Sequence, residues 1–193
     1  MSYEAKSYDH LLGTEGFSDA LLTNHFTLYQ GYVKNTNAII EYLDTKEAGT
    51  PEYAEMQRRL PWEFNGMRLH ELYFGNMKNG GSSLAEGPLK AAIEKTYGSV
   101  ENWQKAFTAV GTMRGIGWVV LYWDAEAQDL FSVWVNEHDV GHLAGCAPLL
   151  VMDVFEHAFM VDYGLKRADY INAFMNAIDW SVVSARFVHA THS

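Results

Sequence analysis

The sequence has little cysteine, little proline and no long apolar run. Its 193 residues include one cysteine and four prolines. A lone Cys146 excludes an internal disulfide and is typical of a reducing compartment. The apolar runs fall short of the roughly 20 residues that a membrane-spanning helix needs, and the first ten residues, MSYEAKSYDH, lack the features of a signal peptide. We therefore expect a cytoplasmic protein without a membrane partner.

Positive charge is also scarce, because 14 Lys and Arg face 24 Asp and Glu, giving a net charge of −10. This balance argues against nucleic acid and anionic membranes as partners, since both select for basic patches. An anionic substrate would need a locally positive approach to its site. Hydrophobic residues at 48% and charged residues at 20% are typical of a globular protein with a sizeable core.

The first part of the chain has a helical pattern. From residue 18 to about residue 46, apolar residues recur at three- and four-residue spacing without a proline, which predicts one long amphipathic helix. Thr50 followed by Pro51 predicts the start of a second helix, which we expect Pro61 to divide.

The Gly/Ser-rich stretch KNGGSSLAEGP, residues 78–88, predicts a connection between two domains. We expect a helical hairpin domain over residues 1–82 and a second domain over residues 83–193.

Beyond two further helices, the apolar period changes. Residues 117–137 hold two β-branched and aromatic runs around a polar turn, which predicts a hairpin. APLLVMD, residues 147–153, is a candidate third strand leading into a helix that carries DVFEH, and residues 167–187 predict a single helix. The fold class is therefore α+β, with a small three-stranded antiparallel sheet flanked by helices in the second domain.

The stretch DVFEHAF places two polar side chains in an apolar segment. In a helix, Asp153 and His157 would share one face. A buried carboxylate must be protonated, paired, hydrogen-bonded or bound to a metal. An Asp/His pair is part of a donor set that suits iron, manganese or zinc, although an ordinary ion pair on a helix surface explains the spacing equally well.

Other histidines are ambiguous when taken alone. His25, Tyr29 and Tyr32 fall at i, i+4 and i+7 on the first helix, which is also the pattern of ordinary core packing. His70 follows an apolar helical face in NGMRLHELYF, where a structural histidine is an equally good interpretation.

Together, these segments resemble one family in order along the chain. DVFEHAF closely resembles the DVWEHAY signature of the iron/manganese superoxide dismutases. HFTLYQGYVKNTN and FNGMRLHELYFGNM resemble the family's two segments that carry a ligand histidine, and GIGW at residues 115–118 resembles its GSGW. The tail YGLKRADYINAFMNAIDW follows the family's pattern of arginine, tyrosine and tryptophan, so that the likeness extends from about residue 8 to 187.

The resemblance implies a metal site and a reaction. His25, His70, Asp153 and His157 would bind one Fe or Mn ion, with iron favoured, and a solvent molecule would be the fifth ligand. The reaction would convert superoxide to dioxygen and hydrogen peroxide, and Tyr32 would orient water and relay protons. Zinc fits the same donors but cannot change its oxidation state.

The family's outer-sphere glutamine is missing, and the resemblance leaves two replacements. His138, in VNEHDVGH, stands near the usual position and could donate to bound solvent, since imidazole titrates near neutrality. His142 is the alternative.

The resemblance also implies a homodimer. Glu156 would reach across the two-fold axis to the ligand histidine of the partner subunit, and an exposed helix glutamate is the less favoured alternative. Tyr29 replaces the family's gateway histidine, and Met160 replaces the tyrosine that meets this histidine across the interface. Trp118 would keep the site dry, and Arg167 would attract superoxide.

Two other functions remain open at this stage. One is a dimeric, metal-binding relative with weak or no dismutase activity, because several residues around the expected site differ from the family. The other is a mononuclear iron oxygenase, because two histidines and a carboxylate also serve that chemistry.

Overall fold

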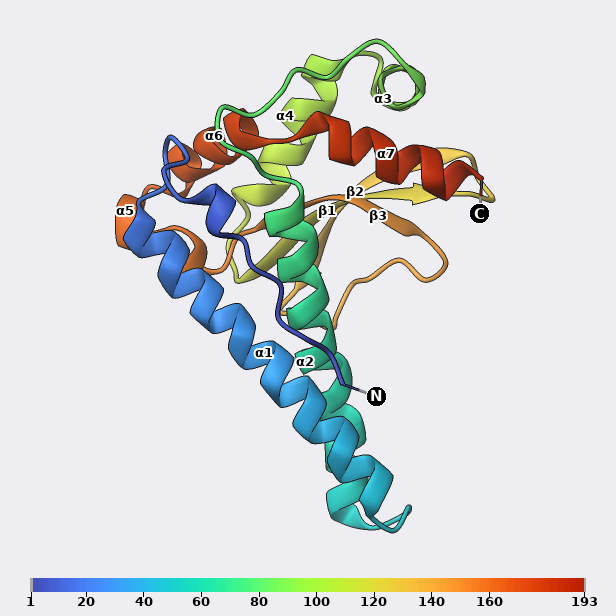
Figure 1. The fold of residues 1–193 in the computed structure, drawn as a ribbon. Helices are drawn as coiled ribbons and strands as arrows, with labels where there is room; N and C mark the ends of the chain where they lie inside the picture. The colour runs from blue at the N-terminus through green and yellow to red at the C-terminus, as the bar shows by residue number, and fades with distance from the viewer. Residues whose placement is uncertain (1, 193) are drawn as a thin grey trace.

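The computed structural model describes residues 2–192, and Figure 1 shows a long helical hairpin joined to a small sheet covered by helices. This agrees with the expected α+β class. Within the described residues, no helix is both long and apolar enough to cross a membrane. The elements are η1 (Asp9–Leu11), α1 (Asp19–Thr45), α2 (Pro51–Gly75), α3 (Pro88–Tyr97), α4 (Val100–Gly111), β1 (Gly117–Asp124), β2 (Asp129–Asn136), β3 (Ala147–Asp153), η2 (Glu156–Ala158), α5 (Met160–Tyr163), α6 (Arg167–Ala177) and α7 (Trp180–Thr191).

Helices α1 and α2 contact each other, converging toward the turn that joins them and lying farther apart at their other ends (Figure 1). The Ser18 hydroxyl caps α1 by accepting from the Leu21 N–H, and α1 runs without a break as predicted. The expected division at Pro61 is wrong, because α2 continues through it. Pro61 is exposed, so water can reach the carbonyl group that loses its helical N–H partner, while the apolar face of α2 stays packed against α1.

The sheet has the strand order β2-β1-β3, and both pairings are antiparallel. The central strand β1 is buried along almost its whole length, which fits its run of aromatic and β-branched residues. Helix α4 contacts β1 and β2, whereas α2 and α7 contact β3. In the register, Trp118 of β1 lies opposite Asp153 of β3. The sheet thereby holds Asp153 at the end of an edge strand that faces α2.

Two expectations about the C-terminal part are wrong. DVFEH is not an α-helix, because Asp153 ends β3 and His157 lies in the short 3-10 helix η2. The predicted single helix over residues 167–187 is broken between α6 and α7. There Ile178 pairs with Met77 and its carbonyl accepts from the Ser82 N–H, so long-range backbone hydrogen bonds replace helical ones.

Asn76 joins the helical hairpin to the sheet. Its fully buried side chain accepts from the Val151 N–H at 2.9 Å and donates to the Tyr73 and Val151 carbonyls at 2.8 and 3.2 Å. The Arg186 guanidinium donates to the same Asn76 oxygen at 3.2 Å. A single amide therefore satisfies polar groups from α2, β3 and α7.

We expect Asn76→Ala to lower the free energy of unfolding by about 2–3 kcal/mol, because it leaves the Val151 N–H buried without an acceptor. Urea unfolding measures the change. Asn172→Ala, at an exposed position of α6, is the control and should stay within about 0.5 kcal/mol of the parent. Equal effects of the two substitutions would contradict the assignment.

Candidate metal centre

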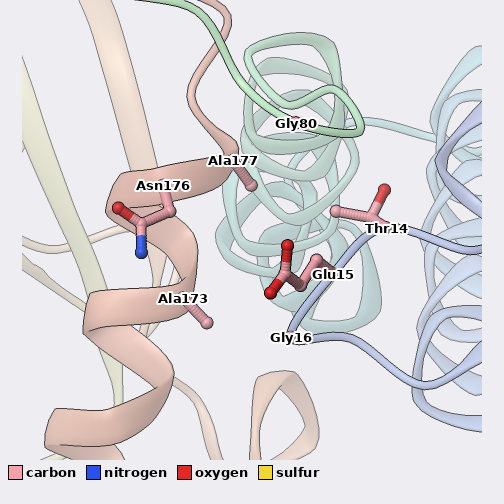
Figure 2. Close-up of a pocket in the computed structure, with 7 residues that line it drawn as sticks. All are labelled: Thr14, Glu15, Gly16, Gly80, Ala173, Asn176 and Ala177. Carbon is pink, nitrogen blue, oxygen red and sulfur yellow. The ribbon is translucent and has the colours of Figure 1, made fainter.

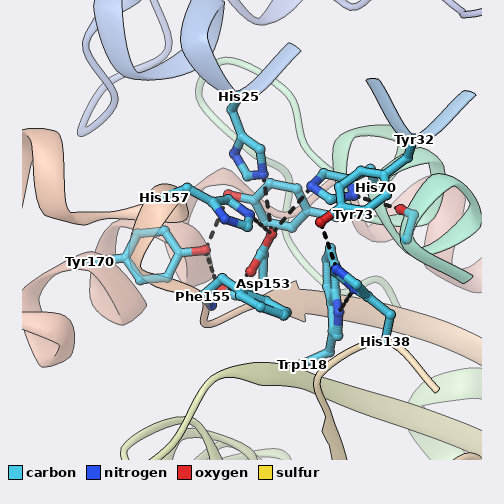
Figure 3. Close-up of polar contacts among 11 residues, drawn as sticks. His25, Tyr32, His70, Tyr73, Trp118, His138, Asp153, Phe155, His157 and Tyr170 are labelled. Carbon is cyan, nitrogen blue, oxygen red and sulfur yellow. Dashed lines mark hydrogen bonds and ion pairs between the residues drawn. The ribbon is translucent and has the colours of Figure 1, made fainter. Parts of the chain in front are cut away.

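Four potential metal ligands meet where the helical hairpin contacts the sheet (Figure 3). His25 comes from α1, His70 from α2, Asp153 from the end of β3 and His157 from η2. One donor atom from each residue lies within 4.8 Å of the others. Two donors bound about 2.1 Å from one ion are at most about 4.2 Å apart, so only a small contraction would complete coordination.

The Asp153 carboxylate is the centre of this cluster. Its Oδ2 lies 3.1 Å from Nε2 of His25, 3.1 Å from Nε2 of His157 and 3.7 Å from Nε2 of His70. Its Oδ1 accepts from the Phe155 N–H at 2.8 Å. This local bond turns the chain after β3, so that His157 returns to the carboxylate without an α-helix.

Two tyrosines support Asp153 from behind. The Tyr170 hydroxyl donates to the Asp153 backbone carbonyl and contacts the Tyr73 hydroxyl at 3.1 Å. Both tyrosines are fully buried. They fix the backbone that carries the central carboxylate.

The hydrogen bond at the opposite side of the His70 ring determines which proton the ring carries. Nδ1 of His70 lies 2.6 Å from the Gly66 carbonyl oxygen, which can only accept, so Nδ1 holds the proton. In the neutral ring, Nε2 then presents a lone pair, and this buried atom has no hydrogen-bond partner among the described residues. A lone pair directed at a carboxylate 3.7 Å away is unfavourable unless a cation lies between them.

The protonation states also suit a cation. Burial alone would raise the pKa of Asp153, but attraction to His157 and hydrogen bonds from His157 and His25 outweigh burial and hold this pKa well below its usual range. Burial lowers the pKa of His25 and that of His70. One carboxylate with three imidazoles is a donor set that fits a single Fe or Mn ion.

Beside the cluster, Tyr32, His138 and Trp118 form a hydrogen-bonded row. The Trp118 indole N–H donates to Nδ1 of His138 at 3.1 Å, so Nδ1 is unprotonated. The neutral His138 ring therefore carries its proton on Nε2, which lies 2.7 Å from the Tyr32 hydroxyl oxygen and donates to it. The Tyr32 hydroxyl proton remains available for another acceptor.

The structure distinguishes the two candidate histidines. His142 contacts the Tyr122 hydroxyl at 2.8 Å and the His138 carbonyl oxygen at 2.8 Å, whereas the His138 ring contacts Tyr32. Burial lowers the pKa of His138 to about 4, whereas a free imidazole titrates near neutrality. Its two ring nitrogens contact Trp118 and Tyr32.

Gly66 gives the Tyr32 ring its space. A Cβ atom at this position would lie 2.5 Å from Cδ1 of Tyr32, far inside van der Waals contact. The Gly66 carbonyl also fixes the His70 tautomer. The NGM segment of α2 therefore contacts both the cluster of candidate ligands and the hydrogen-bonded row that begins with Tyr32.

Comparison with known proteins gives the same answer as the geometry. A family model described as iron/manganese superoxide dismutases, C-terminal domain, matches residues 85–186. The chain belongs to the iron/manganese superoxide dismutase family. It is 39% identical to the superoxide dismutase [Fe] of Cupriavidus metallidurans, with 98% of each chain covered. It is 36% identical to the superoxide dismutase [Mn] 2 of Haloferax volcanii, again with 98% of each covered, and 36% identical to the superoxide dismutase [Fe] of Aquifex pyrophilus, with 94% and 90% covered.

Several residues that the superoxide dismutase resemblance singled out lie outside the cluster. Tyr29 is fully buried, donates to Glu71 at 3.0 Å and accepts from the Lys6 backbone N–H at 3.1 Å. The Arg167 guanidinium donates to the Met113 and Gly115 carbonyls at 2.7 and 2.8 Å.

Glu156 is exposed beside His157, and Met160 is 42% exposed. The predicted role of Glu156 involves a second subunit, and Met160 stands where the resemblance places the family's interfacial tyrosine.

Sequence reasoning missed Trp62, whose ring lies 4.5 Å from that of His138 and 5.6 Å from that of Tyr32. It also missed Tyr73 as a neighbour of Asp153. Trp62 stands about two helical turns before His70, and this spacing was the only signal in the sequence that could have drawn attention to it.

A separate cavity of about 510 Å³ lies between the η1–α1 connection and α6 (Figure 2). Glu15 is the one charged residue among those that line it, and the others drawn there are small or polar. The residues that line this cavity include none of the four candidate ligands, so the cavity is separate from the metal centre of this superoxide dismutase relative.

We expect His70→Ala to reduce bound Fe or Mn at least tenfold, because it removes the donor atom that lacks another partner. Elemental analysis of the purified protein measures the metal per chain. His10→Ala, at an exposed position away from the cluster, is the control and should keep the parental content. Undiminished metal in the His70 variant would show that the ion binds elsewhere.

Proposed function

We propose that this protein is a superoxide dismutase. It converts two superoxide anions and two protons to one dioxygen and one hydrogen peroxide at a single Fe or Mn ion held by His25, His70, Asp153 and His157. The observation that carries the proposal is the buried, unpartnered Nε2 of His70 directed at the Asp153 carboxylate. Membership of the iron/manganese superoxide dismutase family supports the reaction.

The bound ion supplies one-electron redox chemistry, which excludes zinc as the functional metal. The surrounding residues hold and shield it. Asp153 is fixed by the Phe155 N–H and the Tyr170 hydroxyl, and the His70 ring is fixed by the Gly66 carbonyl. Such contacts orient ligands and tune the metal's potential.

Protons are needed only when peroxide forms, and Tyr32 is the group that we propose to deliver them. The Nε2–H of His138 donates to its oxygen, which leaves the Tyr32 O–H free to donate toward the site. Burial raises the pKa of Tyr32 above its usual value, so its hydroxyl stays protonated at neutral pH. Tyr32 is therefore a donor or relay rather than a standing base.

We further propose that Arg167 attracts the anionic substrate despite the net charge of −10. Its guanidinium donates to backbone carbonyls rather than to a carboxylate, so its positive charge is not neutralised by a partner. A local cation can raise the concentration of a small anion near a site.

The remaining alternatives are distinguished by coordination and turnover. A dimeric relative with weak or no dismutase activity would bind the same ion but would not consume superoxide quickly. An iron oxygenase with two histidines and one carboxylate leaves several positions open. The third histidine of this cluster closes one of those positions and favours the dismutase.

A cytoplasmic location and a domain boundary near residue 82 complete the proposal. The single cysteine supports the location, since it fits a reducing compartment. The family's C-terminal domain model begins its match at residue 85, which supports a division between residues 1–82 and 83–193.

The test of the proposed function is reconstitution of metal-depleted protein with iron and with manganese separately. We expect one ion per chain and fast superoxide consumption with at least one of the two metals, with iron the favoured one. Zinc-loaded protein is the control and should be inactive, because zinc cannot change oxidation state. Stoichiometric iron and manganese without activity would instead support the inactive, metal-binding relative.

We also propose a homodimer in which Glu156 meets a ligand histidine of the partner subunit. Glu156 is exposed in the single chain, and nearby Met160 and Leu165 are 42% and 92% exposed. Apolar side chains left exposed beside a charged one are typical of a surface that a partner covers.

We expect light scattering coupled to size-exclusion chromatography to give twice the chain mass, and Glu156→Ala to raise the dimer dissociation constant at least tenfold. Truncating one partner of a buried charged pair has effects of this size. Glu126→Ala, in the exposed β1–β2 turn, is the control. A monomeric parent at micromolar concentration would contradict the proposal.

A further inference from the structure

Trp62 of α2 lies against the loop that carries His138. Its ring centroid is 4.5 Å from that of His138, at an interplanar angle of 76°. Its indole N–H donates to Oε2 of Glu137 at 3.1 Å. One side chain of the helical hairpin therefore contacts two consecutive residues of the loop between β2 and β3.

The backbone of this loop needs support. Glu137 has a φ of +48°, in the left-handed region that a non-glycine residue rarely occupies. Its N–H donates to the Ile116 carbonyl at 3.2 Å, and Asn136 pairs with Val140 on either side of the bend. Such conformations persist only where surrounding contacts fix them. The Trp62 N–H is the contact that α2 makes with the Glu137 side chain.

Trp62 is in turn held in place by neighbouring residues of α2. The Arg59 guanidinium lies over the indole ring, with its carbon 4.0 Å from the ring centroid. Arg59 in turn donates to the buried Glu63 carboxylate at 2.7 and 2.9 Å. The indole therefore has a fixed orientation, supported by a cation–π contact and an ion pair of the same helix.

The His138 ring is enclosed by aromatic side chains. Phe155 stacks on it at 4.7 Å and 21°, and Trp118 donates to its Nδ1. Trp62 contributes to this enclosure from α2. Its indole N–H also binds Glu137, the residue before His138, whose backbone has the positive φ. Without Trp62, the position of the imidazole relative to Tyr32 depends on the loop and on the contacts with Trp118 and Phe155.

We propose that Trp62 is a positioning residue, which through its ring and its hydrogen bond to Glu137 holds the Nε2–H of His138 against the Tyr32 hydroxyl. Its effect on catalysis rests on the proposed dismutase function, whereas its effect on the geometry of His138 does not. If Trp62 only filled space, its ring would be required but its indole N–H would not.

The test compares Trp62→Phe, Glu137→Ala and the double variant, each loaded with metal. Trp62→Phe keeps an aromatic ring and removes the N–H, and Glu137→Ala removes the acceptor at an exposed position. Glu137→Gln keeps an acceptor oxygen and is the conservative variant. Trp134→Phe, a partly buried tryptophan of β2, is the matched control.

We expect Trp62→Phe and Glu137→Ala each to lower kcat/KM about 3- to 10-fold, with parental metal content, because they loosen a group one contact further from the metal than its direct supports. The double variant should lose no more than the worse single variant, since both remove one hydrogen bond. Glu137→Gln should recover most of the activity, and Trp134→Phe should retain it.

The second measurement is independent of activity. Crystal structures of the metal-loaded Trp62→Phe and Glu137→Ala variants should show the His138 Nε2–Tyr32 Oη distance lengthened from 2.7 Å to beyond hydrogen-bonding range, about 3.5 Å. If Trp62→Phe does not fold, Glu137→Ala carries the test alone.

An unchanged His138–Tyr32 distance in the variants would overturn the proposal, as would additive losses in the double variant or an equal loss in Trp134→Phe. An inactive parent protein would instead contradict the dismutase function, and the crystal structures would still decide the role of Trp62.

Discussion

The architecture depends on the burial of one carboxylate. Asp153 is 0% exposed at the end of an edge strand, and its Oδ2 faces three imidazoles. Removing such a charge from water is unfavourable unless it is paired and hydrogen-bonded. The Phe155 N–H satisfies one oxygen, and the other is left to the histidines. Since His70 offers Asp153 a lone pair rather than a proton, a cation between the two groups would remove the repulsion between them.

Much of the fold followed from local patterns in the sequence. The long first helix, the hairpin over residues 117–137 and the third strand are confirmed, because each is set by periodicity and turn residues within a short segment. The errors share one cause. The continuous α2 at Pro61, the strand end at Asp153 and the break at Ile178 are decided by contacts with distant parts of the chain. Local propensity does not contain this information.

The candidate site divides in the same way. The four expected ligands do come together. They could be predicted because their residue types and order matched a family pattern, although the chain from Asp153 to His157 forms a turn and not an α-helix. The groups around them were harder to predict. The protonation of His138 follows from Trp118, which lies 20 residues away in the chain, and from Tyr32, which is 106 residues away. Both its tautomer and its lowered pKa are therefore properties of the folded environment rather than of the histidine.

Metal binding and domain assembly should be coupled in this protein. His25 and His70 come from the helical hairpin, whereas Asp153 and His157 come from the second part of the chain, so neither part holds a complete donor set. The same division runs through the outer contacts, because Tyr32 and Trp62 belong to the hairpin and His138 to the sheet loops. Binding free energy at a site shared in this way is also free energy of association between the two parts. Asn76 makes a second contact without a metal, two residues before Asp153 in β3, through hydrogen bonds that join α2 to Val151. Two contacts thus hold the helical hairpin against the sheet, the hydrogen bonds of the Asn76 amide and the metal centre. Removal of the metal would weaken the second contact more than the first.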